Sequence, residues 1–451
     1  MTETRIPGSF RDPAGYVFAE EGRLFRRILP AGREDFRRFT ESGLAGKLIE
    51  GRRLVPFTPL TEEKDGSLLL RLEALPFISY PYEWSFSQLR DAGLLTLELM
   101  REALRHDLIL KDASAFNIAF RGGEAVFLDH TSFTVCRENE PWRAYRQFVM
   151  HFLAPLVLMK KVDLRCLSLF RADLGGIPLD LASRLLPWTT RFNPDILFHI
   201  HLHARFDRRY SADTRERKIP PMPKKRLENL IRSLQDCLGG LDISAQNTQW
   251  ADYYEHTSYS DASFRFKQER AEAFCREISP RSVCDLGANT GVFSEIAARH
   301  AGEVIAADID PQAVERLYAL SRKIRNLHPV LLDLNNPSPD LGVFNEERRS
   351  FLSRCRCDLA LGLALVHHLR ISGNWTPEQI ARLFGSVAPN ALVEFVPAED
   401  VQVKRLMRGR EQVYTDWTLD HLLAAFRPYY ANYEIEPIPD SPRSLILLRQ
   451  K

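Results

Sequence analysis

The sequence predicts an α/β protein of at least two domains, with a mostly parallel sheet in the C-terminal domain and an α+β arrangement in the N-terminal domain. A chain of 451 residues is too long to fold around a single hydrophobic core. From Ser282 onwards, apolar segments alternate with helical patterns, which is typical of a parallel sheet covered by helices on both faces. The last two apolar segments, 433–439 and 444–449, have a short connection and must pair antiparallel.

In the N-terminal domain, residues 85–107 have the apolar period of a long helix. Residues 117–129 then predict a β-hairpin with Gly122 and Gly123 at its turn. Together, the helix and the hairpin indicate an α+β domain.

A stretch rich in Arg and Lys, residues 205–230, separates the two domains, and three prolines would disrupt a helix there: Pro220, Pro221 and Pro223. The stretch is either a basic patch for phosphates or RNA, or a solvated linker. We favour the linker, because aromatic side chains that could stack on bases are few. The predicted parts are an N-terminal domain, a basic Pro-containing linker with a helix, and a C-terminal domain, at residues 1–204, 205–245 and 246–451.

The C-terminal domain begins with an amphipathic helix and continues with five strands and intervening helices. The predicted strands cover residues 282–288, 303–310, 328–335, 357–366 and 391–397. The predicted helices cover residues 265–278, 291–300, 311–324 and 376–387.

The composition disfavours several classes of protein. A net charge of +2 gives no global attraction to nucleic acid or to anionic membranes. The seven cysteines include no CxxC pair, which fits reduced thiols better than a disulfide framework. No apolar run approaches the roughly 20 residues of a membrane helix, and the first residues lack the order of a signal peptide. We expect a soluble, cytoplasmic protein; the oligomeric state cannot be read from the sequence.

A glycine-containing turn follows the first strand of the C-terminal domain and carries four candidate cofactor-binding residues: Asp285, Gly287, Asn289 and Gly291. Glycines let the backbone approach a ligand closely. A dinucleotide is the competing ligand, but its pyrophosphate would want backbone N–H groups and no carboxylate nearby. S-adenosylmethionine presents an ammonium and a sulfonium, which suit a carboxylate. The charge therefore favours S-adenosylmethionine as the cofactor.

Acidic residues also end the next two strands. Asp308 lies about twenty residues beyond the glycines, where a carboxylate can accept both ribose hydroxyls. Asp310 is a weaker candidate, because it reads as the N-cap of the following helix. Asp333 ends the third strand, where an acid can hydrogen-bond an adenine amino group. Ligands of open α/β sheets bind at this edge.

The segments DLGANTGVFS, DIDPQAVER, LDLNNPSPDLG, LALVHHL and REQVYTDWT resemble a bacterial family of class I methyltransferases that includes the nodulation-protein type. The resemblance extends through DYYEHTSYSDASF, ISYPYEWSFSQL and LKDASAFNI, and therefore covers nearly the whole chain. It implies a Rossmann-like sheet with an antiparallel last strand, S-adenosylmethionine as cofactor, and a methyl acceptor that it does not identify.

Candidate residues for the methyl transfer follow the fourth and fifth strands. His367 and His368 come after the fourth strand, and His368 is the candidate general base. Glu394 is a candidate substrate contact, or alternatively an ion-pair partner of Arg405 or Arg408. Upstream of the sheet, three tyrosines either close over the cofactor or belong to the core, which we favour: Tyr253, Tyr254 and Tyr259.

Asp112 and Asn117 have the D-x-x-x-x-N spacing of protein-kinase-like catalytic loops, and Asp129 follows the hairpin where a metal-binding Asp would lie. Leu110-Lys111 replaces the usual His-Arg, and residues 1–60 contain no glycine-rich phosphate loop. Lys47 lies on an expected helix with no obvious Glu partner. We therefore favour a degenerate kinase-like domain with a vestigial nucleotide site over an active kinase.

Three histidines in FHIHLHARF could suggest zinc: His199, His201 and His203. On a helix only the first and last would share a face, and no carboxylate or Cys lies beside them, so we expect no metal site. The main hypothesis is a methyltransferase acting on a small molecule, a carbohydrate or lipid-linked metabolite, or a protein. A bifunctional kinase-methyltransferase and a non-catalytic cofactor-binding scaffold are the alternatives.

Overall fold

The structure is a computed structural model that describes residues 3–205, 221–243 and 260–450. The chain forms two compact units. The first comprises Met1–Ser244 with Asp340–Arg348, and the second comprises Ala245–Pro339 with Arg349–Lys451. Residues 206–220 and 244–245 of the predicted linker lie outside the described residues, as do the three upstream tyrosines Tyr253, Tyr254 and Tyr259.

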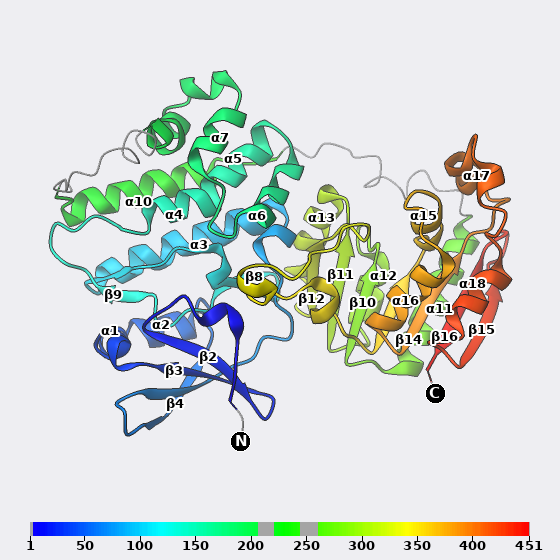
Figure 1. Ribbon diagram of the computed structural model, residues 1–451, viewed down its shortest axis with the longest axis horizontal. Coiled ribbons are helices and arrows are strands. Elements are labelled where there is room, and N and C mark those ends of the chain that lie inside the picture. The colour runs from blue at the N-terminus through cyan, green and yellow to red at the C-terminus, as the bar shows by residue number, and fades with distance from the viewer. Residues whose placement is uncertain (1–2, 206–220, 244–259, 451) are drawn as a thin grey trace. The chain divides into compact units, whose positions relative to one another are not determined.

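The second unit is built on a seven-stranded sheet with the order β12-β11-β10-β13-β14-β16-β15 (Figure 1). The strands are β10 (Ser282–Leu286), β11 (Glu303–Asp308), β12 (Leu327–Leu331), β13 (Leu359–Gly362), β14 (Asn390–Phe395), β15 (Asn432–Pro437) and β16 (Ser444–Arg449). The first five strands in that order pair in parallel. β16 is antiparallel to both β14 and β15, so the predicted antiparallel end of the sheet is confirmed.

Helices of the second unit are α11 (Asp261–Ile278), α12 (Val292–Ala298), α13 (Pro311–Ser321), α14 (Phe351–Arg354), α15 (Val366–Ile371), α16 (Pro377–Val387), α17 (Val401–Met407) and α18 (Leu419–Phe426). Their starts follow local capping chemistry. Ser260 accepts a hydrogen bond from the Ser263 N–H at the start of α11. At the start of α16, Thr376 and Gln379 form a capping box.

One face of this sheet packs against α11, α12 and α13. The shared core consists of alternate strand residues and helix residues: Val283, Val304, Leu359, Leu361, Leu392, Leu445, Phe274, Phe293 and Leu317. Side chains alternate between the two faces of a strand. The acidic residues two positions after Val283 and Leu392, Asp285 and Glu394, therefore point to the same helix-covered face.

The fourth strand is shorter than predicted. β13 ends at Gly362, and residues 363–366 do not continue the strand. The chain turns at Ala364, which has a φ of 53°, and α15 begins at Val366. His367 and His368 therefore lie on a helix that leaves the edge of the sheet.

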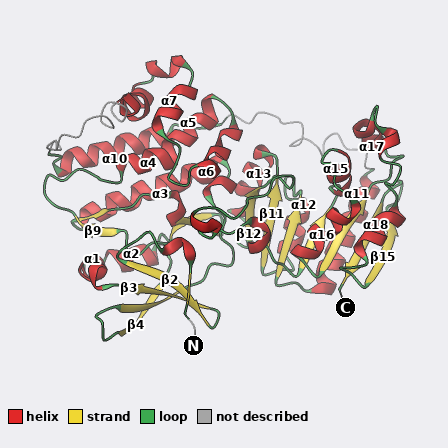
Figure 2. Cartoon of the chain, viewed as in Figure 1, coloured by secondary structure: helices red, strands yellow, loops and turns green. Residues whose placement is uncertain are grey.

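The first unit contains a five-stranded antiparallel sheet with the order β1-β2-β3-β5-β4 (Figure 2). Its strands are β1 (Thr4–Arg5), β2 (Gly15–Glu20), β3 (Arg23–Ile28), β4 (Phe57–Glu62) and β5 (Leu68–Leu72), with helices α1 (Pro30–Glu41) and α2 (Leu44–Glu50) between the third and fourth. The predicted long helix is α3 (Phe86–Arg105), which Ser85 and Gln88 cap.

Two short antiparallel pairs follow α3: β6 (Leu108–Leu110) with β9 (Phe133–Val135), and β7 (Ile118–Arg121) with β8 (Glu124–Phe127). Gly122 and Gly123 connect β7 to β8 with φ values of 58° and 72°. Two positive φ values are the signature of a tight hairpin turn, so the predicted hairpin is confirmed.

The remaining helices of the first unit are α4 (Tyr145–Phe148), α5 (Ala154–Lys161), α6 (Leu169–Ala172), α7 (Leu179–Leu185), α8 (Pro194–Ile196) and α10 (Lys224–Gly239). α10 begins directly after Pro223, so the basic segment does end in a helix.

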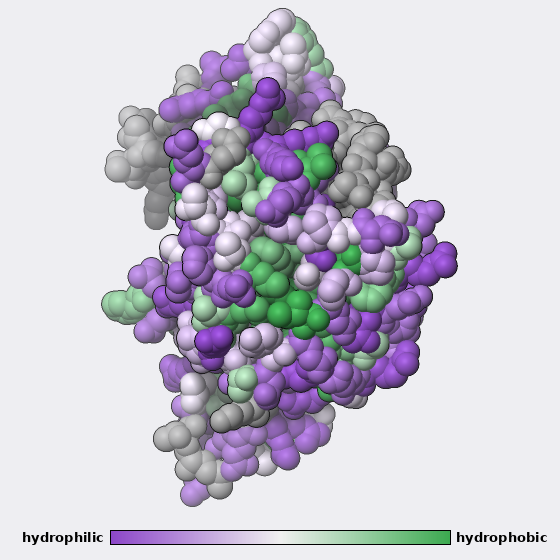
Figure 3. Space-filling view, turned by 90° about the vertical axis from the view of Figure 1, so that its right-hand side faces the viewer, coloured by the Kyte–Doolittle hydropathy of each residue, from purple (hydrophilic) through white to green (hydrophobic). Residues whose placement is uncertain are grey.

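Within the described residues, none of the helices has the length and apolar character that crossing a membrane requires. The seven cysteines are free thiols. Figure 3, viewed from the side on which Figure 1 draws β15, shows hydrophobic residues gathered in a central patch that hydrophilic residues surround.

Candidate functional site

A pocket of about 240 Å³, partly open to solvent, lies at the carboxyl edge of the parallel strands of the second unit. Residues that follow β10, β11, β12 and β13 line it, together with residues of α11 and α15. It brings together four of the six residues predicted for cofactor binding: Gly287, Asn289, Asp308 and Asp333. The edge of the sheet where these residues meet is the edge at which open α/β sheets bind ligands.

Asp308, at the end of β11, accepts a hydrogen bond from the glycine turn that follows β10. Its two carboxylate oxygens accept hydrogen bonds from the Asn289 N–H at 2.7 Å and from the Asp310 N–H at 2.8 Å. Burial raises the pKa of Asp308 to about 6, although these backbone donors oppose the shift. At neutral pH Asp308 is therefore a fixed carboxylate at the pocket wall, and each of its oxygens has a further lone pair for a ligand.

Asp333 is half-buried, and its Oδ1 accepts the Asn335 N–H at 2.9 Å. Leu332 and Leu334 line the pocket beside it, so an apolar surface flanks this carboxylate. Asp310 instead accepts the Gln312 N–H at 2.9 Å and caps α13, as its position before Pro311 predicts.

The other two predicted cofactor residues do not line the pocket. Asp285 is only 2% exposed, and its carboxylate accepts a hydrogen bond from the Ser294 hydroxyl at 2.6 Å. Burial raises the pKa of Asp285 to about 7. Gly291 has a φ of 94°, and a Cβ atom there would lie 2.7 Å from Leu317 Cδ2. Close packing of α12 against α13 therefore explains this glycine, and the role of Asp285 towards a cofactor stays a prediction.

His368 lines the pocket from α15, whereas His367 is fully buried. Burial and the positive charge of Arg443 lower the pKa of His368 to about 4. At neutral pH the imidazole is therefore uncharged. It can accept a hydrogen bond or a proton, but its low basicity makes it a weak general base.

Glu394 is fully buried and belongs to an ion-pair network. Its Oε2 lies 2.5 Å from Lys267 Nζ and accepts the Ala364 N–H at 3.0 Å, and its Oε1 lies 3.3 Å from Arg443 Nη1. Arg443 also pairs with Asp400 at 2.8 Å. The predicted ion pair of Glu394 with Arg405 or Arg408 is therefore wrong, because Glu394 points towards α11. Its role as a substrate contact stays a prediction.

Sequence reasoning missed Lys267, which lines the pocket although it is only 1% exposed. A signal was present, because Ser263, Lys267, Ala271 and Phe274 recur at helical spacing and form the buried stripe of α11. A lysine in such a stripe needs a buried partner. The alternation along β14 puts Glu394 on the face that α11 covers.

In the first unit, the three residues of the expected vestigial nucleotide site come together. Burial and the negative charge of Asp129 raise the pKa of the Asp112 carboxyl, and the neighbouring Asn117 opposes this shift. The Ser114 N–H donates to Asp112 at 2.9 Å. The loop and hairpin thus bring the three residues together, and their role towards a nucleotide stays a prediction.

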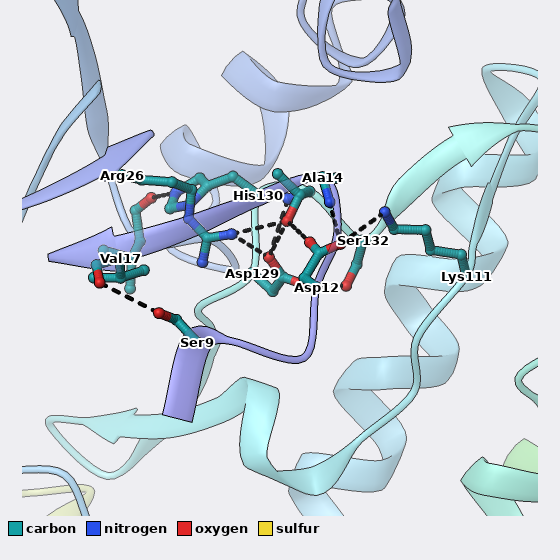
Figure 4. A network of polar contacts seen from close by, with 11 residues as sticks. Ser9, Asp12, Ala14, Val17, Arg26, Lys111, Asp129, His130 and Ser132 are labelled. Atoms are coloured by element: carbon teal, nitrogen blue, oxygen red, sulfur yellow. Dashed lines mark hydrogen bonds and ion pairs between the residues drawn. The ribbon is translucent and has the colours of Figure 1, made fainter. Parts of the chain in front are cut away.

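Asp129 forms an ion pair with an arginine that the sequence analysis did not identify as its partner (Figure 4). Arg26 of β3 lies 2.5 Å from Asp129 Oδ1 and donates to the Thr131 hydroxyl at 2.8 Å. Ser132 donates to the other carboxylate oxygen at 2.5 Å. Burial raises the pKa of Asp129, but Arg26 and these hydroxyls outweigh it, so the net shift is downward. The guanidinium supplies the positive charge that a metal would otherwise supply.

One further expectation about the first unit concerns the lysine Lys47. Lys47 does have a glutamate partner, since its Nζ lies 2.6 Å from Glu102 Oε2 of α3, so the expectation of no partner is wrong. The lysine side chain is 56% exposed, which is typical of a surface ion pair.

The histidines of FHIHLHARF hydrogen-bond to neighbouring hydroxyl groups. His199 lies 2.7 Å from the Tyr145 hydroxyl, and His201 lies 2.8 Å from the Ser183 hydroxyl. His203 packs against the Tyr145 ring. The described residues contain no group of three or more side chains that could hold a metal ion.

Comparison with known proteins identifies one relative that spans nearly the whole chain. The chain is 32% identical to nodulation protein NoeA of Rhizobium meliloti (strain 1021) over 454 residues, which cover 98% of this chain and 95% of the relative. No known family profile matches the chain.

Two solved structures align with part of the chain. One is the N-methyltransferase NodS from Bradyrhizobium japonicum WM9, with 10% identity and a TM-score of 0.31 over 42% of this chain and 98% of that protein. The other is the bifunctional kinase-methyltransferase WbdD, with 16% identity and a TM-score of 0.32 over 47% of this chain and 45% of that protein.

Proposed function

The chain belongs to the family of the nodulation protein NoeA, and we propose that it is an S-adenosylmethionine-dependent methyltransferase. The methyl acceptor belongs to one of three classes: a small molecule, a carbohydrate or lipid-linked metabolite, or a protein side chain. The second unit carries the proposed activity, since it contains the pocket with the predicted cofactor residues.

The observation that carries the proposal is the meeting of Gly287, Asp308 and Asp333 in one pocket at the ends of three adjacent parallel strands. Asp308 would accept the two ribose hydroxyls, and Asp333 with its leucine neighbours would hold the adenine ring. Gly287, with a φ of 74°, lets the backbone approach the rest of the ligand. When bound, the cofactor supplies an electrophilic methyl group on its sulfonium.

The residues of the chain would act mainly by holding the two reactants in line, because alignment gives much of the rate in such a displacement. His368 faces the pocket and is neutral at pH 7. We assign it to orienting the acceptor group by accepting its hydrogen bond. An amine acceptor in its uncharged form attacks the methyl group through its lone pair, so the displacement itself needs no general base.

Titration calorimetry of the full chain with S-adenosylmethionine tests the proposal. Asp308→Ala should weaken binding about 10–100-fold, because hydrogen bonds to a charged group contribute roughly 1.5–3 kcal/mol. Asp420→Ala, at an exposed position in the first turn of α18, is the matched control and should bind like the wild type. Equal affinity of the Asp308 variant and the wild type would contradict the assignment of the site.

We further propose that the first unit is a kinase-like domain that recognises the acceptor without transferring phosphate. The order of long helix, Asp112 loop and hairpin supports the kinase-like assignment. The ion pair between Arg26 and Asp129 supports the absence of phosphate transfer, since it neutralises the carboxylate that would hold a metal.

A further inference from the structure

Lys267 combines two properties that are seldom found together. Its side chain is 1% exposed in α11, and yet it lines the pocket at the carboxyl edge of the sheet. Its Nζ lies 2.5 Å from Glu394 Oε2. Burial lowers the pKa of Lys267, and the charge of Glu394 opposes this shift without reversing it. The contact with the Glu394 carboxylate is that of a buried ion pair, in which the lysine is an ammonium. The pocket therefore has a fixed cation in its wall.

The position of this cation along the pocket follows from its neighbours. Lys267 Nζ lies 5.3 Å from the ring centre of Phe293, the second residue of the helix that follows the glycine turn. The Glu394 oxygen that it contacts also accepts the N–H of Ala364, which follows β13. The ammonium thus lies between the glycine turn and the turn after β13.

Asp308 and Asp333 lie on the other side of the glycine turn, because the strand order is β12-β11-β10-β13. A ligand whose adenine reaches Asp333 after β12 and whose ribose reaches Asp308 after β11 would extend past Gly287 after β10. Its far end would then approach Lys267. The methionine part of S-adenosylmethionine is that far end, and it carries a carboxylate.

We propose that Lys267 binds the carboxylate of the methionine part of S-adenosylmethionine. The proposal rests on the proposed function. Among the described residues that line the pocket, the ionisable groups other than Lys267 are Asp308, Asp333 and His368. Two of these repel a carboxylate, and the imidazole is neutral at pH 7. An ammonium has three donors, so it can hold Glu394 and a ligand carboxylate together.

The competing explanation is that Lys267 serves only as a counter-ion for Glu394. Arg443 also contacts this glutamate, at 3.3 Å. A purely structural lysine would affect every ligand of the pocket alike when it is removed. A carboxylate-binding lysine would affect only ligands that carry the carboxylate.

Calorimetric titrations of the full chain with two ligands separate these cases: S-adenosylhomocysteine, which has the amino-acid part, and 5′-methylthioadenosine, which lacks it. In Lys267→Met, the affinity for S-adenosylhomocysteine should fall about 10–100-fold, as expected for loss of a charge-assisted bond, and that for 5′-methylthioadenosine should stay within about twofold. Lys323→Met, at an exposed position in the same unit, should change neither affinity.

An equal loss for both ligands, or no loss for either, would overturn the proposal. Because Lys267→Met removes one partner of a buried pair, the double variant Lys267→Met/Glu394→Gln is measured as well. It removes both charges and should show the same selective loss. If the wild type binds neither ligand, the proposed function fails and this inference fails with it. If the wild type binds both and Lys267→Met does not discriminate between them, only the inference fails.

Discussion

The guanidinium of Arg26 lies 2.5 Å from the carboxylate of Asp129, and both side chains are buried. Arg26 belongs to the second strand of a β-hairpin near the start of the chain, and Asp129 follows the glycine hairpin 103 residues later. This contact decides how the kinase-like sequence of the first unit is interpreted. Asp129, which the sequence predicts to be a metal ligand, instead forms an ion pair with Arg26.

The first prediction concerns stability. Arg26→Met leaves Asp129 as an uncompensated buried charge and should destabilise the first unit by about 3–5 kcal/mol. Hydrogen exchange at β3 and β8 measures this as a lower free energy of opening. Arg37→Met, in an exposed ion pair of α1, is the matched control and should change little. Similar protection in Arg26→Met and Arg37→Met would show that the ion pair between Arg26 and Asp129 does not stabilise the first unit.

The same pair has a defined pH dependence. The pKa of Asp129 is lowered in the folded protein, so its stabilising effect is present above the unfolded pKa, near 4, and is lost as the pH falls below it. The free energy of opening of β3 and β8 in the wild type should therefore decrease on acidification below about pH 4.

The second prediction concerns nucleotides. We expect no magnesium-dependent binding of ATP by the wild type, because Arg26 already neutralises Asp129. Calorimetry with ATP, with and without magnesium, provides the measurement. Magnesium-dependent binding that disappears in Asp129→Asn would contradict the expectation. It would favour a working phosphotransferase site and hence a bifunctional enzyme.

The third prediction is a pH dependence of cofactor affinity. The pKa of Asp308 is raised to about 6 by burial, so the carboxylate that would accept the ribose hydroxyls is protonated in acid. Affinity for S-adenosylmethionine should be constant near pH 8 and fall up to about tenfold per pH unit below about pH 6. In Asp308→Asn, binding should be weaker and this dependence should be absent. A dependence that persists in the variant would assign the titration to another group.

The fourth prediction separates backbone strain from steric clash. Gly291 and Gly409 both have positive φ, but a Cβ atom at Gly291 would lie 2.7 Å from Leu317 Cδ2, whereas nothing lies within 4 Å at Gly409. Gly409→Ala should cost only the backbone strain, about 1–2 kcal/mol. Gly291→Ala should cost about 1–3 kcal/mol more, because it also overpacks α12 against α13. Hydrogen exchange of α12 and α17 gives the comparison, and equal costs would remove packing as the reason for Gly291.

The local elements could be predicted because their signals lie within short windows. The helical period of residues 85–107 and the glycine pair at 122–123 specify a helix and a turn without reference to the rest of the chain. The extent of the fourth strand could not be predicted. Its apolar run continues past Gly362, while the turn at Ala364 depends on a hydrogen bond to Glu394, thirty residues away.

The sequence by itself determined the alternating strands and helices, the antiparallel end of the sheet, and the glycine turn with acids after successive strands. These follow from apolar period, glycine and proline positions, and the rule that parallel strands share a carboxyl edge. Only the tertiary structure decided which acids face the pocket. It turned Asp285 towards Ser294, paired Glu394 with Lys267, and set Arg26 against Asp129. Such partners come from distant parts of the chain, and their meeting depends on strand register and helix packing, which no local pattern encodes.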